Sequence, residues 1–550
     1  MEKNLELRLY NSLAKIFPHH AAEEQGNIQL MAMYGERVSF QIAYRMAKDW
    51  WRTWGRLKIV APTGVQLELR RIRYIPGSMP QNYTTDENYL TTKSGLFPDL
   101  LEHFNPDQLP LTPGIWQTIW VDVEISAMLT TKEQIYISIE NTDGEELAKG
   151  EVTIEPIPTE LPPLTIPHTR WFHTDCLAIN YGVEIFSEQH WEIIENFAAY
   201  AMRHGMNTLL TPIFTPPLDT AVGGERPIVQ LIDVSVNSSE YTFGFDRLKR
   251  WVEMCKRIGV EYYEISHLFT QWGAKHAPKI IAQDGTRLFG WETDATGPEY
   301  TNFLQQLLPA LTTKLEELGI VKKVIFHISD EPGISDLQQY TNARKIVEPY
   351  LSNYKIVDAL TNYDFYKQGA VSVPIPSVDH IEPFLEGNIP ELWCYYCCAQ
   401  TVDVPNLFFS QPSYRNRVLG VLLYKYNIAG FLQWGYNFYN SMHSLYPVDP
   451  FVTTDADGAF PSGDPFIVYP GPEGQPLGSV RLMVAQEAFY DLRALRLLEK
   501  LAGREYVLNL IDEGLSQPIT FSCYPQGEWV FGLRQRVNIE IAKRIDLLRT

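Results

Sequence analysis

The proline-rich segment at residues 154–167, IEPIPTELPPLTIP, is the feature that most constrains the fold of this chain. Proline lacks the backbone N–H that a sheet interior requires, so this stretch is expected to interrupt the strands before it. Upstream, segments such as VSFQIAYRM, VQLELRRIRYI and TIWVDVEI alternate apolar and polar side chains with period two. Short alternating strands separated by turns predict a β-sandwich over residues 1–155, followed by a linker over residues 156–167.

Beyond the linker, strand-like runs alternate with amphipathic helical stretches such as EQHWEIIENFAAYAMRHG and FDRLKRWVEMCKRIG. The strand-like runs are WFHTDCLA, MNTLLTPI, YYEISH, KVIFHIS, KIVDAL, SVPIPS, ELWCYYC and GFLQWG. Eight such runs within residues 168–447 predict a (β/α)8 barrel of the TIM type, with a doubly wound sheet as the alternative. Residues 448–550 begin with a loop rich in Pro, Gly and Asp and continue into two helices. We expect this C-terminal extension to pack on the barrel.

The bulk composition argues against several classes of partner. A formal net charge of −20 disfavours nucleic acid, and no apolar run is long enough to predict a membrane span. The amino-terminal stretch MEKNLELRLYNSLAKIFPHH has acidic residues and a helix-like pattern in place of a secretory signal, which predicts a cytoplasmic protein. The acidic charge and the predicted β-sandwich fit either a monomer or a homodimer. Six cysteines are too sparse for a disulfide scaffold, and Cys394, Cys397 and Cys398 are expected to be packed, reduced thiols.

The segment VKKVIFHISDEPG carries the strongest chemical signal. An apolar run from Val324 to Ile328 ends in Asp330 and Glu331, and catalytic side chains of barrels gather where strands end. Pro332 is expected to hold Glu331 in an extended conformation. Adjacent carboxylates repel each other, so one pKa rises and one carboxyl can act as a general acid. The chain has two other Asp-Glu pairs, at 86–87 and 512–513, so the strand-end position is what distinguishes this pair.

Aromatic and polar residues at the other predicted strand ends suggest a carbohydrate site, because sugars combine apolar faces with polar edges. The predicted substrate-binding residues are His267, Trp272, His276, Trp291, Tyr395, Trp434, Asn437 and Asp175. The chain lacks the G-x-S-x-G, Walker and H-E-x-x-H motifs. Since His267 and His276 have no obvious third ligand, neither a metal nor a cofactor is expected.

The chain resembles the glycoside hydrolase family of substrate-assisted β-N-acetylgalactosaminidases, part of which is also catalogued as a domain of unknown function. The resemblance covers residues 170–500 and rests on His267 with TQWG at 270–273, FHISDEP, WCYYCC, GFLQWGYNFY, GDPFIVYPG and RLMVAQEAFYDLRAL. It implies that the 2-acetamido group of the substrate attacks the anomeric carbon. Asp330 would orient that group, Glu331 would serve as acid and then base, and Trp434 and Tyr395 would enclose the acetamido group.

Two alternatives remain open at this point. One is a glycosidase for another sugar with a conventional carboxylate nucleophile, for which Asp175, Glu264 and Asp358 are candidates. The other is a carbohydrate-binding protein without catalysis, although such a protein has no evident use for paired acids at a strand end.

Overall fold

The computed structural model describes residues 5–21, 23–48, 51–82 and 84–549. They form two compact units. Unit 1 contains the described residues of 1–164 together with 401–425 and 477–550, and unit 2 contains 165–400 and 426–476. The predicted boundary near residue 155 therefore falls close to the first observed one, whereas the tail divides at 476/477 and not at 447/448.

Unit 1 contains two five-stranded sheets. The first has the order β1 (Leu5–Asn11), β3 (Arg37–Met46), β8 (Gln117–Ile125), β5 (Val65–Gly77) and β6 (Gly95–Glu102). The second has the order β2 (Ile28–Tyr34), β10 (Glu146–Glu160), β9 (Glu133–Asn141), β4 (Thr53–Val60) and β7 (Leu109–Leu111). Both sheets contribute to one hydrophobic core, and the period-two pattern explains how: Ile119, Val121 and Val123 alternate along β8 and are all buried in it.

Two predictions at the ends of this region were wrong. The helix-like amino-terminal stretch forms strand β1 where it is described, because Leu5 and Leu9 enter the shared core; residues 1–4 lie outside the described residues. The predicted linker begins inside β10, which continues to Glu160. Pairing of β10 with β9 stops at Ile154, so Pro156 lies where β10 has a neighbour on one side only, and there proline removes no required hydrogen bond.

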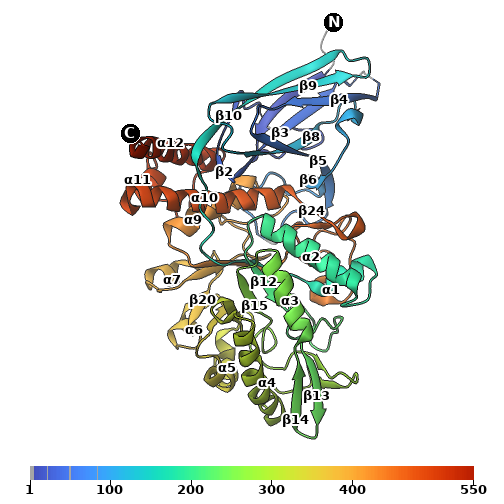
Figure 1. Cartoon of the computed structure of the whole chain (residues 1–550), viewed down its shortest axis with the longest axis vertical. Coiled ribbons are helices and arrows are strands. Elements are labelled where there is room, and N and C mark those ends of the chain that lie inside the picture. Colours follow the sequence, from blue (N-terminus) through green and yellow to red (C-terminus); the bar gives the residue numbers. More distant parts are fainter. Residues whose placement is uncertain (1–4, 22, 49–50, 83, 550) are drawn as a thin grey trace. The chain divides into compact units, whose positions relative to one another are not determined.

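Helices complete unit 1: α8 (Ser413–Arg417), α9 (Leu419–Lys425), α10 (Val480–Ala502), α11 (Arg504–Asp512) and α12 (Trp529–Arg549), with α10, α11 and α12 shown in orange to dark red in Figure 1. Buried ion pairs explain why these late segments group with the amino-terminal sheets. Arg417 of α8 pairs with Glu487 of α10 at 2.7 Å, and Arg534 of α12 pairs with Glu36 at 2.5 Å. The first pair joins residues 70 apart and the second joins residues 498 apart, which periodicity along the sequence cannot report.

Unit 2 contains eight short strands in two parallel sheets. One sheet has the order β11 (His168–Arg170), β22 (Gly430–Gln433) and β21 (Trp393–Tyr395). The other has the order β12 (Thr208–Thr211), β15 (Tyr262–Ile265), β18 (Val324–Phe326), β19 (Lys355–Ala359) and β20 (Val373–Ile375). Backbone hydrogen bonds connect their edges. Asn207 N donates to His168 O at 3.3 Å on one side, and on the other Tyr395 N donates to Pro376 O and Val378 N to Tyr395 O, each at 3.0 Å.

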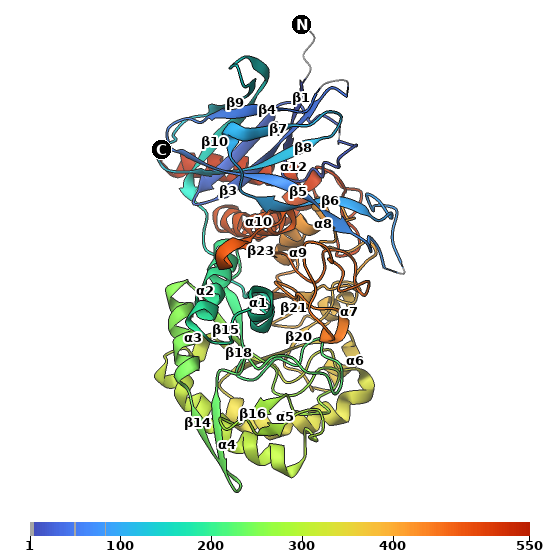
Figure 2. The same cartoon turned by 90° about the vertical axis from the view of Figure 1, so that its right-hand side faces the viewer.

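Two of the helices between these strands begin at residues that favour helix starts. Helix α2 (Glu188–Arg203) starts at Ser187, whose hydroxyl accepts from His190 N, and α4 (Pro298–Glu317) has proline in its first position. The other main helices are α1 (Thr174–Tyr181), α3 (Asp246–Arg257), α5 (Leu337–Leu351), α6 (Tyr363–Lys367) and α7 (Glu382–Glu386). Helices α2 to α5 lie around the outside of the strands (Figure 2).

Short hairpins and bridges complete the described elements: β13 (Asp233–Asn237), β14 (Glu240–Gly244), β16 (Ile280–Ile281), β17 (Arg287–Phe289), β23 (Tyr469–Pro470) and β24 (Pro476–Leu477). The described helices include none that is long and apolar enough to cross a bilayer.

Candidate active site

A cavity of about 700 Å³ opens at the carboxyl ends of the parallel strands of unit 2. It is bounded by segments that follow β11, β12, β15, β18, β21 and β22. Its lining residues are Trp171, Leu218, Asp219, Gln271, Trp272, Asp330, Glu331, Ala359, Tyr395, Cys397, Cys398, Leu432, Trp434 and Phe460. Five of the predicted site residues thus share one cavity: Asp330, Glu331, Trp272, Tyr395 and Trp434.

The loop that carries the two acids is held by the loop that carries Trp272. Trp272 N donates to the backbone oxygen of Asp330 at 2.7 Å. The Ser329 hydroxyl donates to Thr270 O at 2.8 Å and accepts from Ala274 N at 3.1 Å. Residue 273, between Trp272 and Ala274, must be glycine, because its φ is +108° and an added Cβ would lie 2.5 Å from the Asp336 side chain. The two loops therefore form one hydrogen-bonded floor.

Glu331 does not adopt the extended conformation that Pro332 predicted. Its φ is +42°, in the left-handed region, and Trp272 and Asp219 on the same cavity also have positive φ values of 59° and 39°. Such backbone is costly for residues other than glycine and persists only where surrounding contacts impose it. Here the bond from Trp272 N to Asp330 and a side-chain bond from the Tyr395 hydroxyl to Glu331 impose it.

The two acids stand in different surroundings. Glu331 is accessible from the cavity, and its carboxylate accepts a hydrogen bond from the Tyr395 hydroxyl. Removal from bulk water raises the pKa of Glu331, and the bond from Tyr395 acts in the opposite direction. Burial raises the pKa of Asp330 well above its usual range, and the charge of Glu331 raises it further. Among the residues that the structure describes, none donates a hydrogen bond to the Asp330 carboxylate, which is thereby open to a ligand.

Aromatic rings form the walls of the cavity. Trp434 follows β22, and its indole N–H donates to Asp464 at 2.9 Å while its ring lies edge-on to Phe460 with centroids 5.3 Å apart. Trp171 follows β11, and its indole N–H donates to Glu264 at 2.9 Å. Both indoles are therefore fixed in orientation by a buried carboxylate, with apolar ring surface facing the cavity.

Asp219 is a third carboxylate on the cavity, and sequence reasoning missed it. It lies eight residues beyond the end of β12, in a loop without a local motif. Its carboxylate accepts from His443 N at 3.0 Å, and its backbone oxygen accepts from the Ser444 hydroxyl at 2.7 Å. Burial raises the pKa of Asp219. Sequence reasoning also missed Trp171, Gln271 and Phe460. Of these, Trp171 could have been found, since it follows a strand as Trp434 does.

The remaining predicted residues do not line this cavity. Asp175 lies in helix α1 and not on a strand, where it forms a buried ion pair with Arg226 at 2.7 Å. Asn437 is buried and holds the backbone of His173, accepting from its N–H at 2.8 Å and donating to its carbonyl at 3.0 Å. Both residues support the fold around the cavity instead of facing it.

His276 and Trp291 form a separate pair, with ring centroids 5.8 Å apart. Trp291 donates its indole N–H to Gly224 O at 3.0 Å and lines a smaller cavity of about 280 Å³. His267 is buried, with its ring edge-on to that of Trp171 at 5.3 Å. The strand-end rule located all three near the site but could not tell which way each loop turns its side chains.

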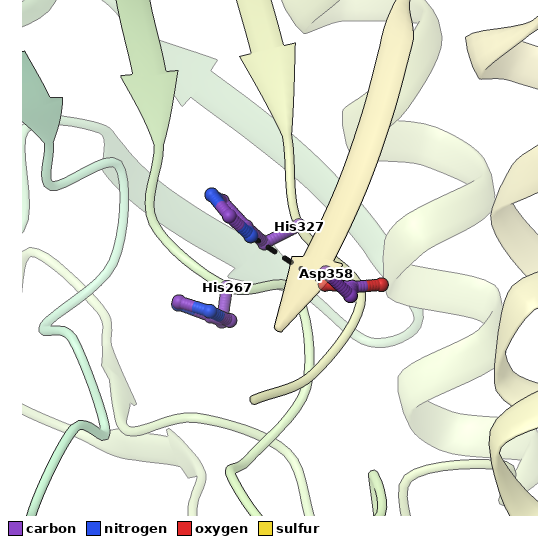
Figure 3. Close-up of side chains that lie close together, drawn as sticks. All are labelled: His267, His327 and Asp358. Atoms are coloured by element: carbon purple, nitrogen blue, oxygen red, sulfur yellow. Dashed lines mark ion pairs between the residues drawn. The ribbon is translucent and has the colours of Figure 1, made fainter. Parts of the chain in front are cut away.

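Below the cavity floor lies a buried group that we name the histidine array: Glu264, His327 and Asp358 (Figure 3 shows the last two). His327 Nε2 lies 2.7 Å from Glu264, and Nδ1 lies 3.5 Å from Asp358. Burial alone would lower the pKa of His327, but the hydrogen bonds to the two carboxylates raise it to about 10. The ring is therefore an imidazolium at neutral pH.

His267, His327 and Asp358 lie close enough to suggest a metal site, but their geometry does not fit one. The two imidazole rings stack with centroids 4.5 Å apart and an interplanar angle of 29°, as Figure 3 shows. Lone pairs of stacked rings lie in nearly parallel planes and do not converge on one ion. Both nitrogens of His327 already face carboxylates, and His267 remains neutral because burial and the charge of His327 lower its pKa.

The cysteine cluster divides between core and cavity. All six cysteines are free thiols, as predicted, and Cys394 is buried in β21. Cys397 and Cys398 are partly accessible and line the cavity beyond Tyr395.

Comparison with protein families matches residues 171–498 to the family described as glycoside hydrolase 123, catalytic domain. A family 123 glycoside hydrolase from Clostridium perfringens, studied for glycolipid glycan hydrolysis, is similar in structure with a TM-score of 0.77 and 14% identity, covering 99% of this chain and 100% of that chain. A search of curated proteins finds no match to the sequence.

Two family 5 enzymes also align with this chain. One is a xyloglucanase from Bacteroides ovatus, at 9% identity and a TM-score of 0.28 over 88% of this chain and 99% of that one. The other is a mannosidase from Rhizomucor miehei, at 11% identity and a TM-score of 0.31 over 60% and 94%. These low scores add nothing to the assignment. The family match, in contrast, spans more than half of the sequence and contains the acid pair and the three tryptophans of the cavity, and the chain belongs to glycoside hydrolase family 123.

Proposed function

We propose that this glycoside hydrolase removes a terminal β-linked N-acetylhexosamine, with N-acetylgalactosamine as the expected sugar, by 2-acetamido substrate assistance. The observation that carries the proposal is the unequal setting of Asp330 and Glu331 on one cavity. The Asp330 carboxylate is partly exposed and accepts no hydrogen bond from the described residues, whereas Glu331 is more exposed and is held by Tyr395. One acid is thus placed to orient a group of the substrate and the other to exchange protons.

In the proposed reaction, the acetamido oxygen of the substrate attacks the anomeric carbon as the bond to the leaving oxygen breaks. Glu331 transfers its proton to that oxygen, and Asp330 accepts the acetamido N–H and stabilises the cationic oxazoline ring. A water molecule then attacks the anomeric carbon from the side that the leaving group vacated. Glu331 takes a proton from this water, the ring reopens, and the product retains its configuration.

The walls of the cavity suit an acetamido sugar. Trp434 and Trp171 offer apolar surface for the acetamido methyl and the sugar ring, and the Tyr395 hydroxyl lies beside Glu331.

We also propose that the two parallel sheets of unit 2 form a single (β/α)8 barrel, since backbone bonds connect their edges. The catalytic domain would then comprise residues 165–400 and 426–476.

A second candidate is a glycosidase that uses a carboxylate of its own as nucleophile. Asp175, Glu264 and Asp358 are poor candidates, because each is buried in ion pairs away from the cavity lining. Asp219 is the carboxylate that favours this alternative, since it lines the cavity. Burial raises the pKa of Asp219, however, and a raised pKa reduces the ionised fraction that a nucleophile requires.

The test compares hydrolysis of the p-nitrophenyl β-glycosides of N-acetylgalactosamine, N-acetylglucosamine and galactose. The variants are Asp330→Asn, Glu331→Gln and Asp219→Asn. Glu87→Gln is the matched control, because Glu87 also follows an aspartate but is exposed in unit 1.

We expect turnover of acetamido sugars only, with kcat/KM reduced about a thousandfold in Asp330→Asn and Glu331→Gln and unchanged in the control. Cleavage of the plain galactoside, with activity lost in Asp219→Asn and kept in Asp330→Asn, would replace substrate assistance by the second candidate.

A further inference from the structure

Two adjacent cysteines, Cys397 and Cys398, line the cavity of the acid pair and have no role in the proposed reaction. Both are partly accessible, and a side-chain hydrogen bond joins their thiols. They follow Tyr395, whose hydroxyl donates to Glu331. The chain thus exposes two neighbouring thiols to a molecule that enters the cavity, close behind the residue that holds the proposed acid.

The turn that carries the thiols is fixed by hydrogen bonds on both sides. Cys397 N donates to the Gln400 side chain at 2.8 Å, and Gln400 N donates back to Cys397 O at 3.4 Å. Gln400 is buried, and its side-chain amide donates at 3.2 Å to Asp379, in the loop after β20. The Ser377 hydroxyl donates to the same oxygen of Asp379 at 2.6 Å. Because the turn is already ordered, little conformational freedom is lost when both thiols bind one atom.

The other four cysteines offer no comparable pair, and all six lie within the described residues. Cys176, Cys255 and Cys394 are buried. Cys523 is exposed in unit 1, has no cysteine next to it in the sequence, and accepts from the Gln517 side chain at 2.8 Å. Cys523 is therefore a natural internal control, an accessible thiol without an adjacent one.

Two thiols without a third ligand select a particular class of ligand. Zinc takes three or four protein ligands. Among the described residues, Cys397 and Cys398 belong to no group of three His, Cys, Asp or Glu side chains whose ligand atoms lie within 4.8 Å of one another. A trivalent organoarsenical requires only two thiols, since its own organic group fills the third valence. Arsenic in this state is a soft acceptor, and soft acceptors prefer thiol sulfur to the carboxylate oxygens of the cavity.

We propose that Cys397 and Cys398 form a dithiol site that binds one trivalent organoarsenical and thereby closes the candidate active site. Each sulfur forms one bond to arsenic, the arsenic–oxygen bond of the oxide breaks, and the two thiol protons leave with that oxygen as water. Arsenic stays trivalent, and neither thiol is oxidised. The organic group then occupies part of the cavity of about 700 Å³ that Glu331 also lines. The effect on catalysis rests on the proposed function, whereas the dithiol site does not.

The same pair should react slowly with reagents that attack a single thiol, because the thiolate is the nucleophile in alkylation. The hydrogen bond with Cys398, burial and nearby charges such as that of Glu331 raise the pKa of Cys397 well above its usual range, so this thiol stays protonated at neutral pH. Condensation with an arsenic oxide requires no net loss of a thiol proton to the solvent, since both protons leave in the water formed. A maleimide should therefore modify Cys523 first, and the arsenical should bind the pair.

The experiment treats wild type, Cys397→Ser, Cys398→Ser and the matched control Cys523→Ser with one equivalent of phenylarsine oxide. Intact mass counts the phenylarsenic groups bound to each chain. Wild type and Cys523→Ser should each bind one group, keep it in excess glutathione, and release it to the dithiol dithiothreitol. The two cavity variants should bind about a hundredfold more weakly, because a chelate forms its second bond intramolecularly and a single thiol cannot.

Hydrolysis of p-nitrophenyl β-N-acetylgalactosaminide by the same samples tests closure of the site. Activity should be lost in treated wild type and Cys523→Ser and should return with dithiothreitol. Uptake at Cys523, or equal uptake by wild type and Cys398→Ser, would overturn the dithiol site; where one serine variant does not fold, the other decides.

Uptake at the pair with unchanged activity would overturn the closure of the site. Wild type that binds one group at the pair but cleaves no acetamido sugar before treatment would overturn the proposed function, and the closure with it, while still supporting the dithiol site. The mass measurement thus separates failure of this inference from failure of the proposed function.

Discussion

Each unit of the molecule buries a cluster of carboxylates, and the two clusters are neutralised differently. In unit 1, Arg417 and Arg534 pair with Glu36, Glu487 and Asp491, a set that we name the arginine cluster. In unit 2, one histidine faces the two carboxylates of the histidine array, and three further acids, Asp219, Asp330 and Glu331, line an open cavity. Permanently charged guanidinium groups pair with every carboxylate of the first cluster, whereas the residues that line the cavity of the second include no arginine or lysine.

The partner of a buried carboxylate determines whether that carboxylate has a structural or a chemical role. A buried carboxylate bound by guanidinium groups has a fixed charge and holds distant segments together. A buried carboxylate without such a partner has a raised pKa and can gain or lose a proton near neutral pH. Substitution of corresponding acids in the two clusters should therefore change different observables, and the following predictions run from the largest expected effect to the smallest.

Asp330→Asn should reduce kcat/KM about a thousandfold while leaving the thermal midpoint unchanged or higher. The neutral amide removes repulsion from Glu331 and a partly exposed charge that lacks a hydrogen-bond donor among the described residues. Steady-state kinetics and a thermal melt of the same preparation test this. A large fall in thermal midpoint would mean that Asp330 is structural and that the contrast between the clusters is false.

Asp491→Asn should show the reverse, a loss of about 3–5 kcal/mol of stability with little change in kcat/KM below the melting temperature. Asp491 accepts from Arg417 at 2.8 Å and 3.1 Å and from Arg534 at 2.9 Å, so its loss leaves two buried guanidinium groups undercompensated. Denaturant unfolding followed by circular dichroism measures the change.

The control for Asp491→Asn is Glu513→Gln, which breaks an exposed ion pair with Arg536 at 2.9 Å. Exposed pairs contribute about 1 kcal/mol or less, so this variant should unfold almost as the wild type does. Equal effects in the two variants would show that the arginine cluster contributes no more than a surface pair.

Tyr395→Phe should lower kcat about tenfold with a smaller effect on KM. The Tyr395 hydroxyl donates to Glu331 and lowers its pKa, so the variant should have a higher pKa at Glu331. Because the proposed mechanism uses Glu331 in its protonated form, the basic limb of the pH profile should move to higher pH. An unmoved basic limb would mean that Glu331 is not the acid that this limb reports.

Sequence reasoning located the acid pair of the cavity because its signal is local. A β-branched run followed by Asp330, Glu331 and Pro332 marks a strand end, and parallel strands bring their ends together. The same rule placed Tyr395, Trp434 and Trp272 on the cavity but misassigned residues whose loops turn away. Trp291 faces another cavity.

The remaining features depend on long-range contacts that no local pattern encodes. Asp219 reaches the cavity because residues 443 and 444 hold its loop. Pro156 is tolerated in β10 because β9 ends its pairing two residues earlier, which only the pairing register reveals. The tail was predicted to pack on the barrel, but most of it belongs to unit 1. The reason is the same, because the ion-pair partners of Arg417 and Arg534 lie far from them in the sequence.

Glu487→Gln gives the smallest and most specific test of the comparison. Burial raises the pKa of Glu487 to about 7, although Arg417 and Ser12 act to lower it, so this acid is the weak member of the arginine cluster. An acid whose pKa is higher in the folded than in the unfolded state binds an extra proton when folded, and stability falls as pH rises through that interval. The interval runs here from the ordinary value of 4.5 to about 7.

Above pH 7 the wild-type cluster holds three carboxylates against two guanidinium groups, and the variant holds two against two. Glu487→Gln should therefore raise the thermal midpoint by about 2 °C at pH 8, leave it unchanged at pH 5, and flatten the pH dependence of stability between them. Melts at pH 5 and pH 8 measure this. A lower midpoint at pH 8 would mean that the third carboxylate stabilises the cluster, and that an excess of buried acid does not by itself distinguish a catalytic region from a structural one.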